Sequence, residues 1–97
     1  MDLTVIPEEL VSTGAVIESM VAEVATQVAV SAQPITAVMP AGVDDASLLA
    51  SVNFATHGAN FLAQAAAAAS LLASGAAAMV HAGTVYRAQE NANTSLL

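Results

Sequence analysis

The sequence predicts an all-α fold, in which two long helices run antiparallel as an αα-hairpin. Apolar side chains recur at helical spacing in two long segments, and Pro40 and Gly42 mark a turn between them. The second segment contains no Asp, Glu, Lys or Arg from Ala46 to Tyr86. Because two helices joined by a short turn run in opposite directions, these patterns indicate a single hairpin domain over residues 1–97.

The first helix is predicted to span residues 7–38. Pro7 suits a first helical turn, where its missing N–H is not needed, and Glu8 and Glu9 then lie at the positive end of the helix dipole. Apolar residues follow at spacings of three, four and seven, so they form one stripe. The stripe consists of Leu10, Ile17, Val21, Val24 and Val28.

Pro34 interrupts this helix, because proline lacks a hydrogen-bond donor and restricts the residue before it. The apolar spacing nevertheless continues through Ile35 and Val38. We therefore favour a helix that kinks at Pro34, and a helix that stops at Gln33 is the alternative.

A turn over residues 39–44 is predicted to lead into a second helix over residues 45–88, capped by Asp44 or Asp45 and followed by a flexible tail to residue 97. On a helical wheel, its large apolar side chains occupy roughly 200°, more than the stripe of about 100° that one neighbouring helix covers. They include Phe54, Phe61, Leu62, Leu72 and Met79. Part of this arc therefore requires a partner besides the first helix.

The middle of the second helix, from Ala63 to Ala78, is rich in alanine, whose small side chain permits close helix approach. Counting back from the turn places Pro7 opposite about Ala76. Met79 to Glu90 is therefore expected to extend past the start of the first helix and to be available for recognition.

Composition excludes several classes of function. The chain has a formal net charge of −7 and a single basic residue, Arg87, so it lacks the basic surface that nucleic acids require. It has no Cys for disulfides or thiolate chemistry. Hydrophobic residues make up 57% of the chain but aromatic residues only 3%, so each buried position removes little apolar area from water. The isolated chain is expected to be marginally stable.

Catalytic motifs find no support in the sequence. His57 and His81 are far apart, and neither has an acidic or histidine residue at a helical metal-ligand spacing. The serines lie in no G-x-S-x-G motif. We therefore expect a non-enzymatic protein without a catalytic, cofactor-binding or metal-binding site.

Tyr86 and Glu90 lie four residues apart, and thus on one face of the predicted helix end. One interpretation is a recognition signal. The alternative is an ordinary surface tyrosine, with Arg87 paired to Glu90 three residues further on.

Four short motifs, in this order and spacing, resemble the PE family of mycobacterial proteins, named for a Pro-Glu pair near the amino terminus. They are Pro7-Glu8, Ile35-Thr36-Ala37-Val38 before the turn, Phe54-Ala55-Thr56-His57-Gly58, and Tyr86-Arg87-Ala88-Gln89-Glu90-Asn91-Ala92-Asn93. The resemblance covers essentially the whole chain.

This resemblance implies a hairpin that forms an obligate heterodimer with a PPE-family protein and so contributes half of a four-helix bundle. It also implies export through a type VII (ESX) secretion system, with Tyr86 and Glu90 as the Y-x-x-x-[DE] signal. An EspG-type chaperone would act indirectly, through the PPE partner. The protein would be cytoplasmic before export and then secreted or on the cell surface.

The predicted partner interface combines the apolar residues of both helices. It comprises Leu10, Ile17, Val21, Val24, Val28, Phe54, Phe61, Leu62, Leu72 and Met79. Two alternatives use the same apolar surface: a membrane-associated or membrane-inserted helix, and a self-associating helical bundle. The start of the chain, Met1-Asp2-Leu3-Thr4, has neither the positive nor the apolar region of a Sec signal peptide.

Overall fold

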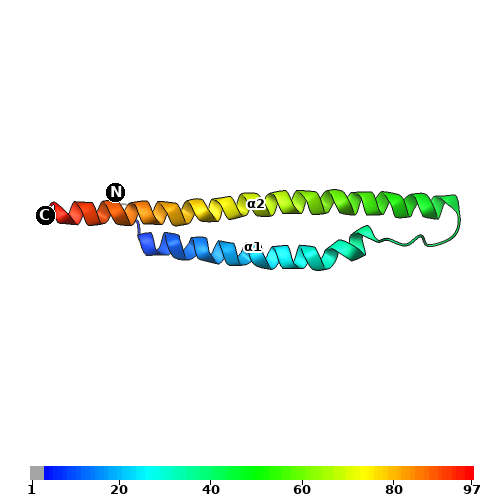
Figure 1. Ribbon diagram of the computed structural model, residues 1–97, viewed down its shortest axis with the longest axis horizontal. Helices are drawn as coiled ribbons and strands as arrows, with labels where there is room; N and C mark the ends of the chain where they lie inside the picture. Colours follow the sequence, from blue (N-terminus) through cyan, green and yellow to red (C-terminus); the bar gives the residue numbers. More distant parts are fainter. Residues whose placement is uncertain (1–3) are drawn as a thin grey trace. The chain divides into compact units, whose positions relative to one another are not determined.

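A computed structural model describes residues 4–97, and their regular secondary structure is entirely α-helical. Helix α1 spans Pro7–Thr36 and helix α2 spans Asp45–Ser95, and the two pack against each other as a hairpin (Figure 1). The predicted all-α hairpin is therefore confirmed. Met1–Leu3, which include most of the segment without Sec-signal features, lie outside the described residues.

Contacts within the chain divide it into two compact units. The terminal unit contains the residues up to Val21 and Ser70–Leu97, and the turn unit contains Ala22–Ala69. Each unit therefore pairs part of α1 with part of α2.

Helix α1 begins at Pro7, as predicted, with the Ile6 carbonyl accepting hydrogen bonds from the amides of Glu9 at 3.0 Å and Leu10 at 3.4 Å. It continues through Pro34, so the alternative of a stop at Gln33 is wrong. The Ala37 amide donates to the Gln33 carbonyl at 2.8 Å, which closes the last turn.

The helix ends at Thr36 rather than at residue 38. Pro34 has no amide to donate to the carbonyl four residues earlier, so this end of α1 is held by fewer hydrogen bonds. The Val38 carbonyl instead accepts a hydrogen bond from the Ser51 hydroxyl on α2, at 2.5 Å. The chain therefore leaves the helix two residues before the predicted end, and Val38 bonds to α2 instead.

Asp44 is the residue that caps α2, which decides between the two predicted candidates. Its carboxylate accepts hydrogen bonds from the Ser47 amide at 3.1 Å and from the Ser47 hydroxyl at 2.8 Å. These bonds satisfy an amide of the first turn and hold the pKa of the Asp44 carboxyl below its ordinary value.

Helix α2 continues to Ser95, well past the predicted end at residue 88, so most of the expected flexible tail is helical. No proline follows Asp45 and no glycine follows Gly83, so nothing in the sequence ends the helix earlier. Polar side chains add local hydrogen bonds here: Gln89 Nε2 donates to Asn93 Oδ1 at 2.9 Å, and Thr94 Oγ1 donates to the Glu90 carbonyl at 2.9 Å.

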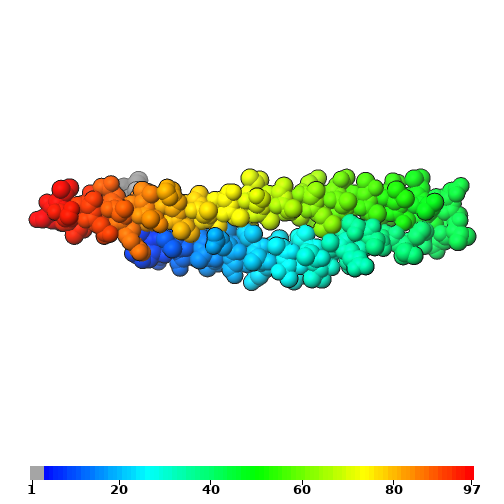
Figure 2. All heavy atoms as spheres, viewed as in Figure 1, coloured from blue at the N-terminus to red at the C-terminus, as the bar shows by residue number. Residues whose placement is uncertain are grey.

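The helices of the terminal unit meet at glycines. A Cβ atom built on Gly14 of α1 would lie 2.6 Å from Val80 Cγ2 and 2.9 Å from the Ala76 carbonyl oxygen of α2. A Cβ atom built on Gly83 of α2 would lie 2.8 Å from the Pro7 carbonyl oxygen. The two backbones therefore approach more closely than a larger residue permits, and Figure 2 shows the start of α1 (blue) against the orange part of α2.

Pro7 therefore lies opposite Gly83 rather than Ala76, and the predicted register is wrong. Because residues 37–44 are not helical, they advance up to about 3.3 Å per residue, against about 1.5 Å in a helix. Residues 37–44 lie beside the first turns of α2, as the hydrogen bond from Ser51 to Val38 shows. The end of α1 therefore packs against α2 only from about Gly58 onward. The projecting part of α2 starts after Arg87, not at Met79.

The turn unit has the same kind of contact at Gly58. A Cβ atom built there would collide with the carbonyl oxygen and carbonyl carbon of Ile35. Only a residue without a side chain fits at this crossing of α1 and α2.

Burial is confined to very small residues. Among residues 4–97, the buried ones are Gly14, Gly58, Ala76 and Gly83, and no side chain larger than a methyl group is fully buried. The described chain therefore has no core of large apolar side chains.

The close crossing at Gly58 predicts opposite effects of the same substitution at two glycines of α2. Gly58→Ala should destabilise the hairpin by about 1–3 kcal/mol, because the added methyl group must displace the Ile35 backbone. Gly75→Ala is the matched control: nothing lies within 4 Å of its Cβ position, so better helix propensity should stabilise it by about 0.5–1 kcal/mol. The far-UV circular dichroism of each purified variant, followed as a function of temperature, measures how much helix it retains, and equal changes in both variants would contradict the close crossing.

Candidate functional site

The predicted partner-facing residues fall into two groups. One group is partly buried within the hairpin itself, and it consists of Leu10, Ile17, Val21, Val28, Leu62 and Met79. The other group is exposed to solvent, and it consists of Val24, Phe54, Phe61 and Leu72. Within the second group, Phe54 and Phe61 are the two side chains that expose more than half of their surface.

In the turn unit, the two phenylalanines are the largest exposed apolar side chains. Phe54 is 63% exposed and Phe61 is 54% exposed. They lie seven residues apart, or two helical turns, and therefore on one face of α2. This face is the strongest candidate for a protein contact in the turn unit.

Each phenylalanine lines an open groove. Phe61 shares its groove with residues of α1, namely Glu23, Val24, Thr26, Gln27, Val28 and Ser31. Phe54 shares a second groove with Val38 and Met39 of the connecting segment and with neighbouring small residues of α2. The grooves are mainly apolar, but the acidic residue Glu23 lines the Phe61 groove and takes part in no ion pair among residues 4–97.

In the terminal unit, Leu72, Met79 and Tyr86 follow at spacings of seven and so share one face of α2. Leu72 and Tyr86 are exposed, and Met79 is partly buried. Tyr86 therefore lies two helical turns beyond Met79, past the last of the predicted partner-facing residues.

Tyr86 is 47% exposed and Glu90 is exposed, and both lie within α2. Their spacing of four residues in a continuous helix places them on one face, as predicted. Two adjacent, accessible side chains of different chemistry are thus available here to a protein that reads this helix end.

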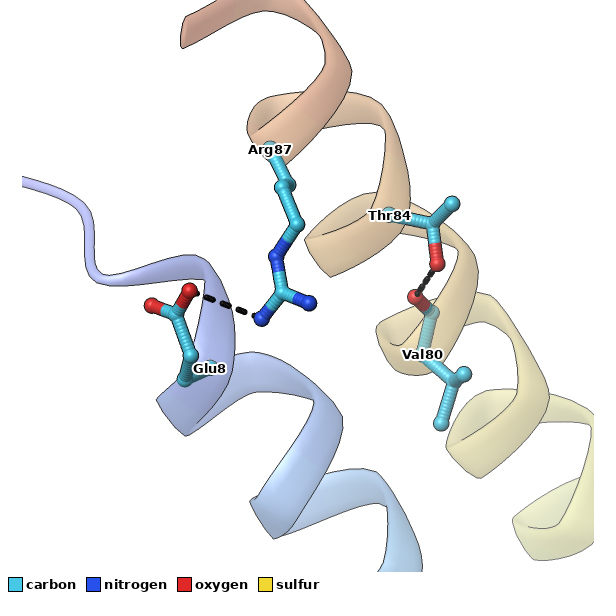
Figure 3. A network of polar contacts seen from close by, with 4 residues as sticks. All are labelled: Glu8, Val80, Thr84 and Arg87. Carbon is cyan, nitrogen blue, oxygen red and sulfur yellow. Dashed lines mark hydrogen bonds and ion pairs between the residues drawn. The ribbon is translucent and has the colours of Figure 1, made fainter. Parts of the chain in front are cut away.

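Arg87 pairs with Glu8 and not with Glu90. Its Nη2 atom lies 2.7 Å from Glu8 Oε1, in the only ion pair among residues 4–97, and Figure 3 shows the guanidinium reaching from α2 to the first turn of α1. The alternative in which Arg87 pairs with Glu90 is therefore wrong. Glu90 keeps its carboxylate free for other contacts.

The Pro7-Glu8 motif consequently contacts the end of α2 at both of its residues. The Pro7 carbonyl lies at the Gly83 crossing, and the Glu8 carboxylate meets Arg87. Sequence reasoning missed this contact because its register placed Pro7 opposite Ala76. The available signal was that Arg87 is the only cation of the chain, so any ion pair between side chains other than histidine has to use it.

No group of three or more His, Asp or Glu side chains that could hold a metal ion occurs in the described part of the chain. His57 and His81 are both exposed on α2. They lie in different units of the chain.

Both helices are long and apolar enough to cross a membrane on the criteria of length and composition. The qualifying stretches have mean hydropathies of 1.3 in α1 and 1.5 in α2, and little of either is buried within the chain. Core helices of soluble proteins meet the same criteria.

Comparison with known proteins identifies relatives over nearly the whole chain. Residues 3–93 match the PE family. The PE family immunomodulator PE15 of Mycobacterium tuberculosis, from strain CDC 1551 / Oshkosh and from strain ATCC 25618 / H37Rv, is 34% identical over 90 residues, which cover 93% of this chain and 88% of the relative. No solved structure matches the chain. With a match of this extent, and with the Pro7-Glu8 pair at the start of α1, the chain belongs to the PE family.

Proposed function

We propose that this chain is a non-enzymatic subunit that forms an obligate heterodimer with a PPE-family protein, as half of a four-helix bundle. It carries the Y-x-x-x-E signal for ESX secretion at Tyr86 and Glu90. The observation that carries the heterodimer is the absence of any fully buried large side chain among residues 4–97, while Phe54 and Phe61 are exposed.

Large apolar side chains remain partly or largely in contact with water in the described hairpin. Burying a Phe, Leu or Met side chain completely stabilises a folded protein by about 1.5–3 kcal/mol. None of these side chains is completely buried in the described hairpin. Interfaces of obligate complexes commonly bury more than about 2,000 Å² in total and resemble a domain core cut in half. A partner that covers the phenylalanine face supplies the missing core.

Charge favours a different protein over a second copy of this chain. Each copy carries a formal net charge of −7, and its one Lys or Arg side chain, Arg87, is engaged with Glu8. Self-association would bring acidic surfaces together without a free arginine or lysine, which opposes assembly. A heterologous helix pair can carry a cation to Glu23 at the edge of the Phe61 groove.

The exposure of Tyr86 and Glu90 supports their assignment as an export signal. Tyr86 and Glu90 lie on the end of α2, where the residues after Arg87 are all exposed. Recognition by the ESX machinery does not require the hairpin to open. An EspG-type chaperone acts on the PPE partner, so this chain meets it only indirectly, in the cytoplasm before export to the medium or cell surface.

A membrane-associated helix is the second candidate function, and the apolar stretches of α1 and α2 are the observation that favours it. Against it stand the net charge of −7, which disfavours anionic lipid surfaces, and the serines, asparagines and glutamine that interrupt α2.

The phenylalanine face predicts loss of assembly in the variant Phe61→Asp. A carboxylate in an apolar interface is costly to bury, so co-expression with the PPE partner should yield no soluble heterodimer. Asn60→Asp is the control, because it adds the same charge to the same helix at an exposed polar residue that lies about 100° around α2 from Phe61. Co-purification followed by gel filtration measures both. Recovery of normal heterodimer from Phe61→Asp would refute the assignment of this face.

The export signal predicts that assembly and secretion separate. Tyr86→Ala and Glu90→Ala should each leave the heterodimer intact and prevent its appearance in culture filtrate. Asn91→Ala is the neighbouring control, because this exposed residue lies about 140° around α2 from Tyr86 and about 100° from Glu90. Immunoblots of filtrate and cell lysate give the ratio, and unchanged secretion of both signal variants would sink the hypothesis.

The two candidate functions differ in lipid binding. The purified heterodimer should remain at the bottom of a density gradient when mixed with phosphatidylcholine and phosphatidylglycerol vesicles, because its apolar faces are covered by the partner. Flotation of the intact heterodimer with the vesicles would favour the membrane function instead.

A further inference from the structure

Within the terminal unit, two contacts join the end of α2 to the first turn of α1. Gly83 lies against the Pro7 carbonyl, and one turn later Arg87 bonds to Glu8 at 2.7 Å. After Arg87, every residue of α2 is exposed, and its recorded side-chain hydrogen bonds are local, such as Gln89 to Asn93. Among the described residues, the Glu8–Arg87 ion pair is therefore the contact with α1 that lies nearest the C-terminal end of α2.

The two candidate signal residues, Tyr86 and Glu90, lie directly beside this ion pair. Tyr86 precedes Arg87 in sequence, and Glu90 follows it by three residues, so the ion pair lies within one helical turn of both. Helix ends without tertiary contacts open locally at low free-energy cost. The ion pair between Arg87 and Glu8 fixes this part of α2 to α1. It therefore influences whether the turn from Tyr86 to Glu90 stays helical and keeps one direction.

Arg87 pairs with one particular carboxylate among several nearby. Arg87 is the only lysine or arginine in the chain, and it bonds to Glu8 although Glu9 is adjacent to Glu8 and Glu90 is on its own helix. Both partners are about half-exposed or more, and exposed ion pairs contribute little to global stability. Its effect is therefore expected in local orientation rather than in folding.

We propose that Glu8 is a positioning residue for the export signal. Through Arg87 it holds the base of the Tyr86–Glu90 turn against α1, so that both signal side chains are presented in one geometry. This inference rests on the proposed role of Tyr86 and Glu90 in secretion. It assigns a task to the Glu of the Pro-Glu motif that is separate from the partner interface.

A charge-swap series in the complete heterodimer tests the proposal. The series contains Glu8→Gln, Arg87→Glu, the double variant Glu8→Arg with Arg87→Glu, and Tyr86→Ala. Glu9→Gln and Glu9→Arg are the matched controls, because they alter the same helix turn and the same dipole end without touching the ion pair. The readouts are heterodimer yield in cells, secreted fraction, and amide hydrogen exchange of residues 84–95 in the purified complex.

We expect heterodimer yield to be unchanged throughout. Glu8→Gln and Arg87→Glu should lower the secreted fraction by about two- to fivefold, the range over which an exposed ion pair shifts a two-state equilibrium, and should speed amide exchange over residues 84–95. The double variant should restore both, and the Glu9 variants should behave as wild type.

The outcomes separate this inference from the function on which it rests. If Tyr86→Ala is secreted normally, the signal hypothesis itself fails, and the positioning role fails with it. If Tyr86→Ala blocks secretion while Glu8→Gln and Arg87→Glu match the Glu9 controls, only the positioning role is overturned. Failure of the double variant to recover above the single variants also overturns it.

Discussion

The close approach of α1 and α2 at very small residues is the constraint on which the other features depend. Gly14 and Gly83 in the terminal unit, and Gly58 in the turn unit, each lie against the backbone of the opposite helix. Such contacts use backbone and methyl groups, so the large side chains are displaced to the flanks of the helix pair. Phe54 and Phe61 consequently remain exposed, and the proposed need for a partner follows from how the hairpin itself packs.

The same constraint arranges the end of α2. Because Gly83 admits the Pro7 carbonyl, the first turn of α1 comes close enough for Glu8 to reach Arg87. The Pro-Glu motif therefore has a structural use in this chain: proline begins α1 where a donor is not needed, and glutamate bonds to the only arginine. The proposed signal at Tyr86 lies beside this contact, so packing and presentation are physically linked within the terminal unit.

Local features of the fold could be predicted from sequence, because they depend on neighbouring residues. The start of α1 at Pro7 and a cap at Asp44 or Asp45 follow from helix-end chemistry, and the structure confirms the first and selects Asp44. The register could not be predicted, because it depends on the length that the non-helical residues 37–44 take up beside α2. Without that register, a helical wheel cannot separate residues such as Leu62, which lie partly buried in the hairpin, from Phe61, which faces outward.

The central claim, that the hairpin is incomplete without a partner, is tested most directly by unfolding the purified chain alone. Urea titration followed by circular dichroism, with sedimentation velocity on the same samples, reports cooperativity and association state together. An incomplete hairpin gives a broad, non-cooperative loss of helicity that sharpens only when the proposed PPE-family partner is present. A monomer that unfolds alone in one sharp, cooperative transition would contradict the claim.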